Sequence, residues 1–176
     1  DGDNDKKGEL SWRVHILPLI GEANLYNEFH LDENWDSPHN KKLIERMPDI
    51  FKTEGVTENG KTAIHVFTSK GALFDDRNKN FNGKRIGHRL RDVIDGTSNT
   101  IMAVMAGADK ADVWTKPGGL EFTLRSPKKS LGSIPANGFV TLFGDGRVRL
   151  LKKSISSKTL ILLILYADGK IIREKF

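Results

Sequence analysis

The fold is decided by the stretch Phe139-Val-Thr-Leu-Phe143-Gly-Asp-Gly-Arg147-Val-Arg-Leu-Leu151. Two short apolar runs flank a Gly-Asp-Gly sequence, and an Asp-Gly pair in that position is a strong signal for a β-hairpin. With Asp145 and Gly146 as the two central turn residues, Phe143 faces Val148 and Thr141 faces Leu150, and residues that face each other lie on the same side of the hairpin. This register predicts a common core side for four side chains: Phe143, Thr141, Val148 and Leu150.

Strand patterns also precede the hairpin. Residues 62–68 alternate with the period of two that is typical of a strand. Residues 100–106 form an apolar run typical of a buried strand, although their Met and Ala residues leave a helix possible. Residues 116–138 contain three prolines among their loops, so we expect this segment to be irregular.

After the hairpin, one helix and one further strand are expected. Ser156 or Ser157 can cap a helix that continues to Tyr166, since a serine side chain accepts a hydrogen bond from the first turn. The Asp-Gly pair at 168–169 predicts a turn, and a last strand is predicted at 170–173.

The first third of the chain has a helical pattern instead. Ser11 can cap a short helix that ends near Pro18, because proline lacks the N–H group that a helix interior needs. A second helical stretch is expected at residues 25–29. The sequence Asp36-Ser37-Pro38 places proline just after an N-cap residue and predicts a helix that Pro48 ends.

Together these patterns predict an α+β fold, in which N-terminal helices pack on a mostly antiparallel β-sheet. The length of 176 residues suits one globular domain. Within it we expect a flexible start at residues 1–9, a mainly helical part at 10–50, and strands and loops at 51–176 with one late helix near 157–166.

Charge is divided unevenly along the chain. The net charge is +5, but residues 1–60 carry 7 Lys and Arg against 13 Asp and Glu, whereas residues 61–176 carry 21 against 10. A basic part can bind acidic glycans or other polyanions, and the acidic and basic parts can attract each other within one chain or between copies. The basic residues are scattered, however, and mixed charge also simply keeps a domain in solution.

Motifs for chemistry are absent from the sequence. It contains no cysteine, no G-x-S-x-G nucleophile motif and no phosphate-binding loop, and none of its five histidines lies within four residues of another. We therefore expect neither an enzyme nor a metal or other cofactor. Two carboxylates that folding brings together would reopen the possibility of hydrolysis.

The three tryptophans are the candidates for stacking on a ligand such as a sugar ring. Trp12 lies on the apolar side of a predicted helix and is expected in the core. Trp35 precedes an N-cap and can fix a helix start. Trp114, with Lys116 two residues later, is the best ligand candidate, and the alternative is that it too is structural.

Six segments read together resemble one family: Leu10-Ser-Trp-Arg-Val-His-Ile-Leu-Pro18, Asn24-Leu-Tyr-Asn27, Trp35-Asp-Ser-Pro-His-Asn40, Asp95-Gly-Thr-Ser-Asn-Thr100, Trp114-Thr-Lys-Pro117 and Phe143-Gly-Asp-Gly-Arg-Val148. The family is a solute-binding-protein-like domain of unknown function that is abundant in planctomycete bacteria. The chain departs from its pattern twice. Pro135 stands where the family has a histidine that nine intervening residues separate from Asp-Gly, and Met105 and Ala106 stand where a glutamate is usual.

The resemblance implies an extracytoplasmic location and a pilin-like or pseudopilin-like sheet. The family domain commonly follows a prepilin leader and an apolar helix, so membrane contact is expected only through a segment that precedes Asp1. The longest apolar run of the chain, at 160–165, is too short to span a bilayer. We expect no binding to nucleic acid.

Two functions follow as hypotheses. The first is a noncatalytic domain for envelope assembly or surface display, with other protein subunits or further copies as partners. The second is a binding module that captures acidic glycans, other anionic polymers or solutes. The candidate ligand or motif residues are Trp114, Lys116, Trp35, Asp36, Asp95, Ser98, Asn99 and Asp145.

Overall fold

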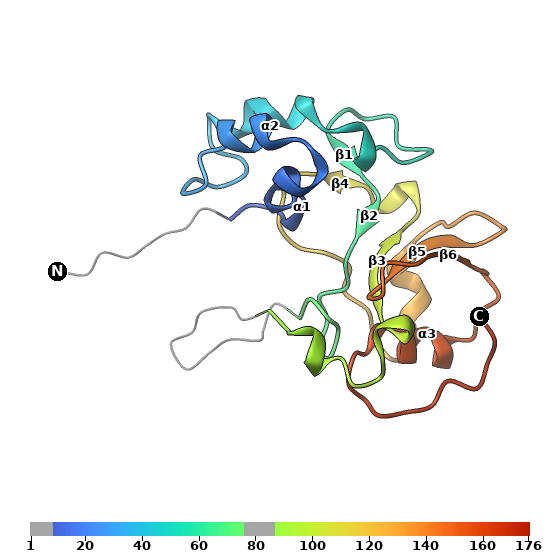
Figure 1. Cartoon of the computed structure of the whole chain (residues 1–176). Helices are drawn as coiled ribbons and strands as arrows, with labels where there is room; N and C mark the ends of the chain where they lie inside the picture. Colours follow the sequence, from blue (N-terminus) through green and yellow to red (C-terminus); the bar gives the residue numbers. More distant parts are fainter. Residues whose placement is uncertain (1–8, 76–86) are drawn as a thin grey trace. The chain divides into compact units, whose positions relative to one another are not determined.

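The computed structural model describes residues 9–75 and 87–176, and the fold is α+β, as predicted (Figure 1). The chain divides into two compact units. Unit 1 consists of the described residues up to Ala63 together with Ala111–Gly118, and unit 2 consists of the described residues of Ile64–Lys110 and Gly119–Phe176. The flexible start predicted at 1–9 falls almost entirely outside the described residues. One domain over 1–176 stays a prediction.

Unit 1 is built mainly from short helical segments. Ser11 caps the first helix as predicted, since its side chain accepts a hydrogen bond from the Arg13 N–H. The segments are α1 (Trp12–His15), η1 (Leu17–Ile20), α2 (Ala23–Glu28), η2 (Asn40–Arg46) and η3 (Asp49–Phe51). A two-stranded antiparallel sheet of β1 (Lys61–Thr62) and β4 (Asp112–Val113) completes the unit.

Unit 2 contains a four-stranded antiparallel sheet with the strand order β2-β3-β5-β6. Its strands are β2 (Ile64–His65), β3 (Ile101–Met105), β5 (Phe139–Phe143) and β6 (Val148–Leu151). The late helix, α3 (Ser157–Ile164), is capped by Ser156, one of the two predicted serines. Short 3-10 segments lie between the strands: η4 (Leu90–Asp92), η5 (Thr97–Asn99), η6 (Ala108–Lys110) and η7 (Pro127–Leu131).

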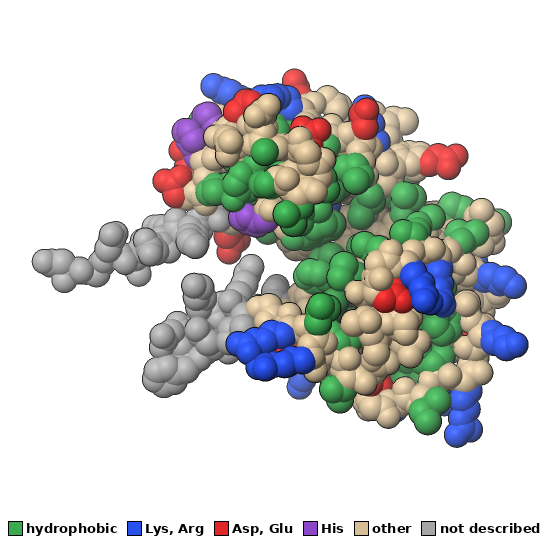
Figure 2. Space-filling model, viewed as in Figure 1, with side chains coloured by type: hydrophobic (Ala, Val, Ile, Leu, Met, Phe, Trp, Pro, Cys, Tyr) green, Lys and Arg blue, Asp and Glu red, His purple; other side chains and the backbone are tan. Residues whose placement is uncertain are grey.

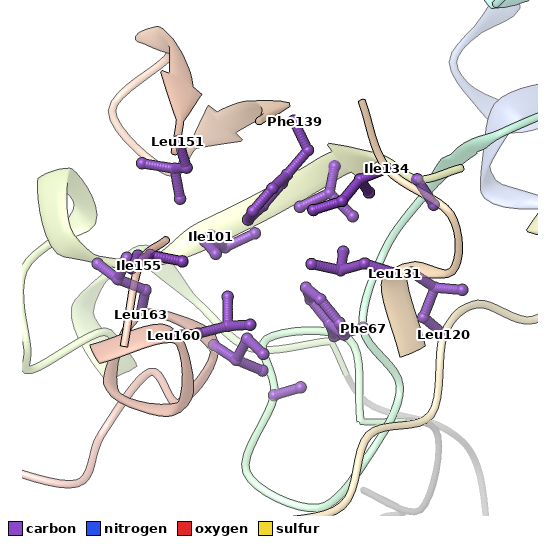
Figure 3. Close-up of a cluster of buried hydrophobic side chains, with 14 of the residues drawn as sticks. Phe67, Ile101, Leu120, Leu131, Ile134, Phe139, Leu151, Ile155, Leu160 and Leu163 are labelled. Atoms are coloured by element: carbon purple, nitrogen blue, oxygen red, sulfur yellow. The ribbon is translucent and has the colours of Figure 1, made fainter. Parts of the chain in front are cut away.

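The core of unit 2 lies between one side of the sheet and α3. Figure 3 shows Leu160 and Leu163 of α3 and the hairpin residues Phe139 and Leu151 directed into one cluster of buried apolar side chains. Leu160, Leu163 and Leu151 are fully buried. The run at 160–165 that looked most hydrophobic in the sequence is therefore mostly part of this domain's own core.

The hairpin at 139–151 is confirmed, but its predicted register is wrong by one residue. The turn is a three-residue loop, in which the Phe143 N–H donates to Arg147 O at 2.9 Å and Gly146 has a φ of 84°. Glycine accepts this left-handed conformation without strain, and it is usual for a three-residue loop. Phe143 therefore pairs with Arg147. Phe143 and Thr141 point into the core, whereas Val148 and Leu150 point away from it.

Other predicted elements are shifted or missing. The helix expected from Pro38 begins at Asn40 and is a 3-10 segment. The strand expected at 62–68 is divided, because the chain leaves the sheet of unit 1 after Thr62 and joins the sheet of unit 2 at Ile64. No strand forms at 170–173. No backbone-to-backbone hydrogen bond joins these residues to another described strand, and Ile172 packs against the core cluster through its side chain.

Candidate functional site

The candidate residues fall into two groups, one in each unit. Unit 2 contains four of them: Asp95, Ser98, Asn99 and Asp145. The first three lie close together in the sequence, and Asp145 lies in the hairpin loop that contacts this segment. Unit 1 contains the other four: Trp35, Asp36, Trp114 and Lys116. The two groups thus belong to different units.

The Asp95 carboxylate binds the backbone of a turn near the C-terminus. Its Oδ2 accepts a hydrogen bond from the Asp168 N–H at 2.7 Å, and its Oδ1 accepts one from the Gly169 N–H at 2.8 Å. Hydrogen bonds to an ionised group are stronger than those between neutral groups. Asp95 thus holds the predicted Asp-Gly turn at 168–169, and both of its carboxylate oxygens are used within the protein.

The residues after Asp95 form a turn that contacts the hairpin loop. The Asn99 side-chain amide donates to Asp95 O at 3.2 Å, and the Thr100 hydroxyl donates to the carbonyl of Gly96 at 3.1 Å. The Gly144 N–H then donates to Thr100 O at 2.9 Å. Two segments that the sequence analysis singled out, 95–100 and 143–148, therefore meet in the fold.

The contact between these two segments is close. A Cβ atom at Gly144 would lie 3.1 Å from Thr97 O. Ser98 is half-buried, and Asp145 Oδ1 accepts a hydrogen bond from the Arg147 N–H within the hairpin loop at 3.0 Å. The contacts of Asp95, Asn99 and Asp145 are those of turn-forming residues.

Trp114 is fully buried in unit 1, which corrects its selection as the best ligand candidate. Its Nε1 donates to Ile44 O at 2.9 Å. Its ring stacks on Phe51 with centroids 5.8 Å apart and meets the edge of Phe29 at 5.9 Å. No face of the indole is open to a sugar ring, so its role is in the core, the structural alternative for this residue.

Lys116 lies at the surface beside Trp114 in the sequence but does not form a site with it. Its Nζ makes an ion pair with Asp112 Oδ2 at 2.8 Å. Asp112 also interacts with Arg13, a buried side chain that the sequence analysis missed. Burial lowers the pKa of the Arg13 guanidinium to about 10 and the charge of Asp112 opposes that shift, so Arg13 stays charged at neutral pH.

Asn40 is the residue that organises the Trp35–Asn40 motif, and the sequence analysis missed it. It is fully buried, and its Oδ1 accepts a hydrogen bond from the His30 N–H at 3.0 Å. Its Nδ2 lies within hydrogen-bond distance of three backbone carbonyls, those of His30, Glu33 and Asn34. Trp35 is half-buried and Asp36 is exposed, so this motif is built around the amide rather than around those two residues.

Two histidines stack at the surface next to this loop. The rings of His30 and His39 are parallel, with centroids 3.5 Å apart. His30 Nδ1 lies 2.8 Å from Glu33 Oε1, and His39 Nε2 lies 2.8 Å from the carbonyl oxygen of Glu28. Hydrogen bonds from Ser37 and then from His30 hold the pKa of the Glu33 carboxyl below its ordinary value.

The outward side of the β5–β6 hairpin is apolar, and we call it the outer hairpin face. It consists of two cross-strand pairs, Val140 with Leu150 and Leu142 with Val148. Val148 is 65% exposed and Leu150 is 52% exposed. In Figure 2 hydrophobic side chains reach the surface around this hairpin, beside Lys and Arg side chains. An antiparallel sheet with one side in water normally carries polar residues there, so this surface is unusual for a side that faces only solvent.

β6 is also an edge strand, since among the described strands it pairs only with β5. Phe143 and Arg147 form a hydrogen-bonded pair, and such pairs alternate along an antiparallel ladder. The backbone N–H and C=O groups of Val148 and Leu150 therefore point away from β5. Free backbone groups next to exposed apolar side chains are what a further strand or a subunit surface can bind.

A groove of about 610 Å³ runs between α3 and the C-terminal residues of unit 2. Its cations are Lys158, Lys170 and Arg173, and Lys170 is paired with Asp168 at 3.3 Å. Glu174 is the acidic residue of its lining. Hydrogen bonds from Ser156 and then Thr159 hold the pKa of the Glu174 carboxyl below its ordinary value.

The residues that the structure describes contain neither a cluster of metal ligands nor a helix that could span a membrane. No three of their His, Asp or Glu side chains come together as a set of metal ligands. No helix in this part of the chain has both the length and the hydrophobicity to cross a bilayer.

Comparison with known proteins gives one similarity. Residues 1–52 match the model of a family described as a protein of unknown function (DUF1559), which supports the resemblance found for the N-terminal segments. No curated protein and no solved structure shows significant similarity to the chain. The matched part contains the helices α1 and α2 and the loop around Asn40. The first 52 residues of the chain are thus similar to the DUF1559 family.

Proposed function

We propose that the chain is a noncatalytic interaction domain of an extracytoplasmic, pseudopilin-like envelope assembly, and that it binds other protein subunits, including copies of itself. The outer hairpin face is the observation that carries this proposal. Four apolar side chains and a free strand edge lie together on one surface, and burying the exposed side chains Val148 and Leu150 would be favourable at about 25 cal/mol per Å².

The charges of the two units support association between copies. Unit 1 has 9 Lys and Arg against 14 Asp and Glu, a net charge of −5, whereas unit 2 has 19 against 9, a net charge of +10. Arg147 and Lys152 flank the exposed strand β6. The acidic unit of one copy is therefore attracted to the basic unit of the next, and such a head-to-tail contact can continue into a chain of subunits.

Sedimentation velocity at increasing protein concentration tests this proposal. We expect the wild type to self-associate, and we expect Val148→Thr with Leu150→Thr to weaken association about tenfold or more, because the apolar contact is lost. Added salt should weaken it further, since the charges are exposed. Leu124→Thr removes a similarly exposed apolar side chain outside the sheet and serves as the control. A wild type that stays monomeric at all concentrations contradicts the proposal.

A second candidate function, capture of an anionic polymer, is favoured by the groove beside α3. Lys158 and Arg173 line it and form no ion pair with another described residue. Retention on an acidic polysaccharide column tests this alternative. We expect Lys158→Glu with Arg173→Glu to abolish retention at low salt, and equal retention of variant and wild type would exclude the groove as the binding site.

A further inference from the structure

Residues 170–176, which we call the C-terminal arm, are held to unit 2 almost entirely by side chains. No backbone-to-backbone hydrogen bond joins the arm to the rest of the described chain. It follows the turn at Asp168 and Gly169, where Gly169 has a φ of 70°. Three side chains at alternate positions, Ile172, Glu174 and Phe176, make its contacts with the unit.

The middle anchor is a carboxylate at the start of α3. Glu174 accepts hydrogen bonds from the Ser156 N–H at 3.2 Å and from the Ser156 hydroxyl at 2.6 Å, and it also accepts one from the Thr159 hydroxyl. The first turn of a helix has free N–H groups and favours a negative charge. This end of α3 therefore has a specific place for one acidic side chain.

The other two anchors are apolar and pack against the core cluster of unit 2. The Phe176 ring stacks on Phe143 with centroids 6.0 Å apart. The Arg149 guanidinium lies 5.3 Å from the centroid of Phe143 and 5.6 Å from that of Phe176, so it contacts both rings as a cation. The binding surface thus recognises an aliphatic, an acidic and an aromatic residue at every second position.

The arm leaves open space along its length. The groove of about 610 Å³ lies between it and α3, and a second groove of about 320 Å³ is lined by Leu150, Ile155 and the last three residues of the arm. Ile171, within the arm, is 80% exposed. The contacts that hold the arm are those of its three side-chain anchors, and an identical segment can remake all of them.

We propose that this surface is a peptide-binding site for the pattern aliphatic-x-acidic-x-aromatic, and that in the assembled protein it takes the C-terminal arm of a second copy. This inference rests on the proposed self-association. A second copy offers the same Ile172, Glu174 and Phe176, so exchange of arms preserves every contact that the arm makes in one chain. The turn at Gly169 is the hinge, and exchange of an identical element is a low-cost route to association.

A labelled peptide tests the site directly. The receptor is the full chain with Glu174→Ala and Phe176→Ala, which weakens its own arm, and the probe is a fluorescein-labelled peptide of residues 168–176. We expect saturable binding by fluorescence anisotropy, and about tenfold or weaker binding when the peptide itself carries Glu174→Gln and Phe176→Ala. Far-UV circular dichroism verifies that the receptor is folded. A folded receptor that does not bind the peptide overturns the inference.

A second measurement uses the wild type and does not depend on folding of the variant. Excess unlabelled peptide should lower the extent of self-association in sedimentation velocity, while the doubly substituted peptide should not. If the wild type associates and the peptide has no effect on it, arm exchange is wrong and the proposed function stands. If the peptide binds the receptor but the wild type never associates, the site exists but does not take the arm of a second copy. The proposed function then fails as well.

Discussion

Trp114 and Trp12 allow a sharp test of how unit 1 is held together. The Nε1 atoms of both are buried, but only that of Trp114 has a hydrogen-bond partner, the carbonyl of Ile44 at 2.9 Å. Both rings contact Phe51. The same substitution, tryptophan to phenylalanine, therefore removes a buried hydrogen bond at one position and an unpaired donor at the other.

The expected magnitudes differ for that reason. Trp114→Phe leaves the Ile44 carbonyl without its partner, which costs about 1–3 kcal/mol, and the lost ring atoms leave a cavity that adds ~1 kcal/mol. We expect a total loss of about 2–4 kcal/mol in the free energy of unfolding. Trp12→Phe loses ring contacts but also removes an unpaired buried N–H group, so its effect should lie within about 1 kcal/mol of zero.

Urea unfolding followed by far-UV circular dichroism measures both variants, since tryptophan fluorescence changes with the substitution itself. The slope of the free energy against urea should stay constant while the midpoint falls for Trp114→Phe. Equal midpoints for the two variants would refute the reasoning, because the hydrogen bond to Ile44 would then contribute nothing measurable.

Three further predictions concern single positions. Gly138→Ala should destabilise the hairpin by about 3 kcal/mol or more, because the φ of Gly138 is 126° and a Cβ there would overlap a backbone oxygen of β6. Gly146→Ala, at the turn where a Cβ meets open space, should cost about 1 kcal/mol. Equal shifts of the two melting temperatures would contradict this. Asn40→Asp removes the donor to three carbonyls and buries a charge, so it should cost about 3 kcal/mol or more by urea unfolding, and a neutral effect would contradict the role of Asn40. The folded-state pKa of Glu174 is lowered, so its contribution to stability is complete above the unfolded pKa of about 4.3 and is lost as the pH falls through the folded value. Glu174→Gln should therefore make the free energy of unfolding fall less steeply as the pH is lowered through this range. An unchanged fall would contradict this.

Local turn and cap chemistry made much of the fold predictable. The caps at Ser11 and Ser156 and the hairpin at 139–151 were confirmed, because each depends on residues close in the sequence. The register of the hairpin was not predicted correctly. Asp-Gly fits both a two-residue and a three-residue loop, and the choice between them decides which apolar side chains face the core.

The candidate sites were less predictable, because their contacts join distant parts of the chain. Asp95 was selected from its motif, but its partners at 168–169 lie more than seventy residues away. Asn40 lies within a quoted motif, yet only the fold shows that its side chain binds three carbonyls. A tryptophan in a Pro-containing loop can contact a ligand or belong to the core, and the local sequence does not distinguish these roles. Only the fold shows that Trp114 is a core residue.

Hydrogen exchange at the edge of β6 tests most directly whether the outer hairpin face is the surface through which the protein assembles. The amides of Val148 and Leu150 point away from β5, so in the free monomer they should exchange fast. We predict that at concentrations where the wild type associates, exchange at these two amides slows about tenfold or more, while the amide of Arg149, which faces β5, is slow at every concentration. Unchanged exchange at Val148 and Leu150 in the associated protein would contradict assembly through this edge.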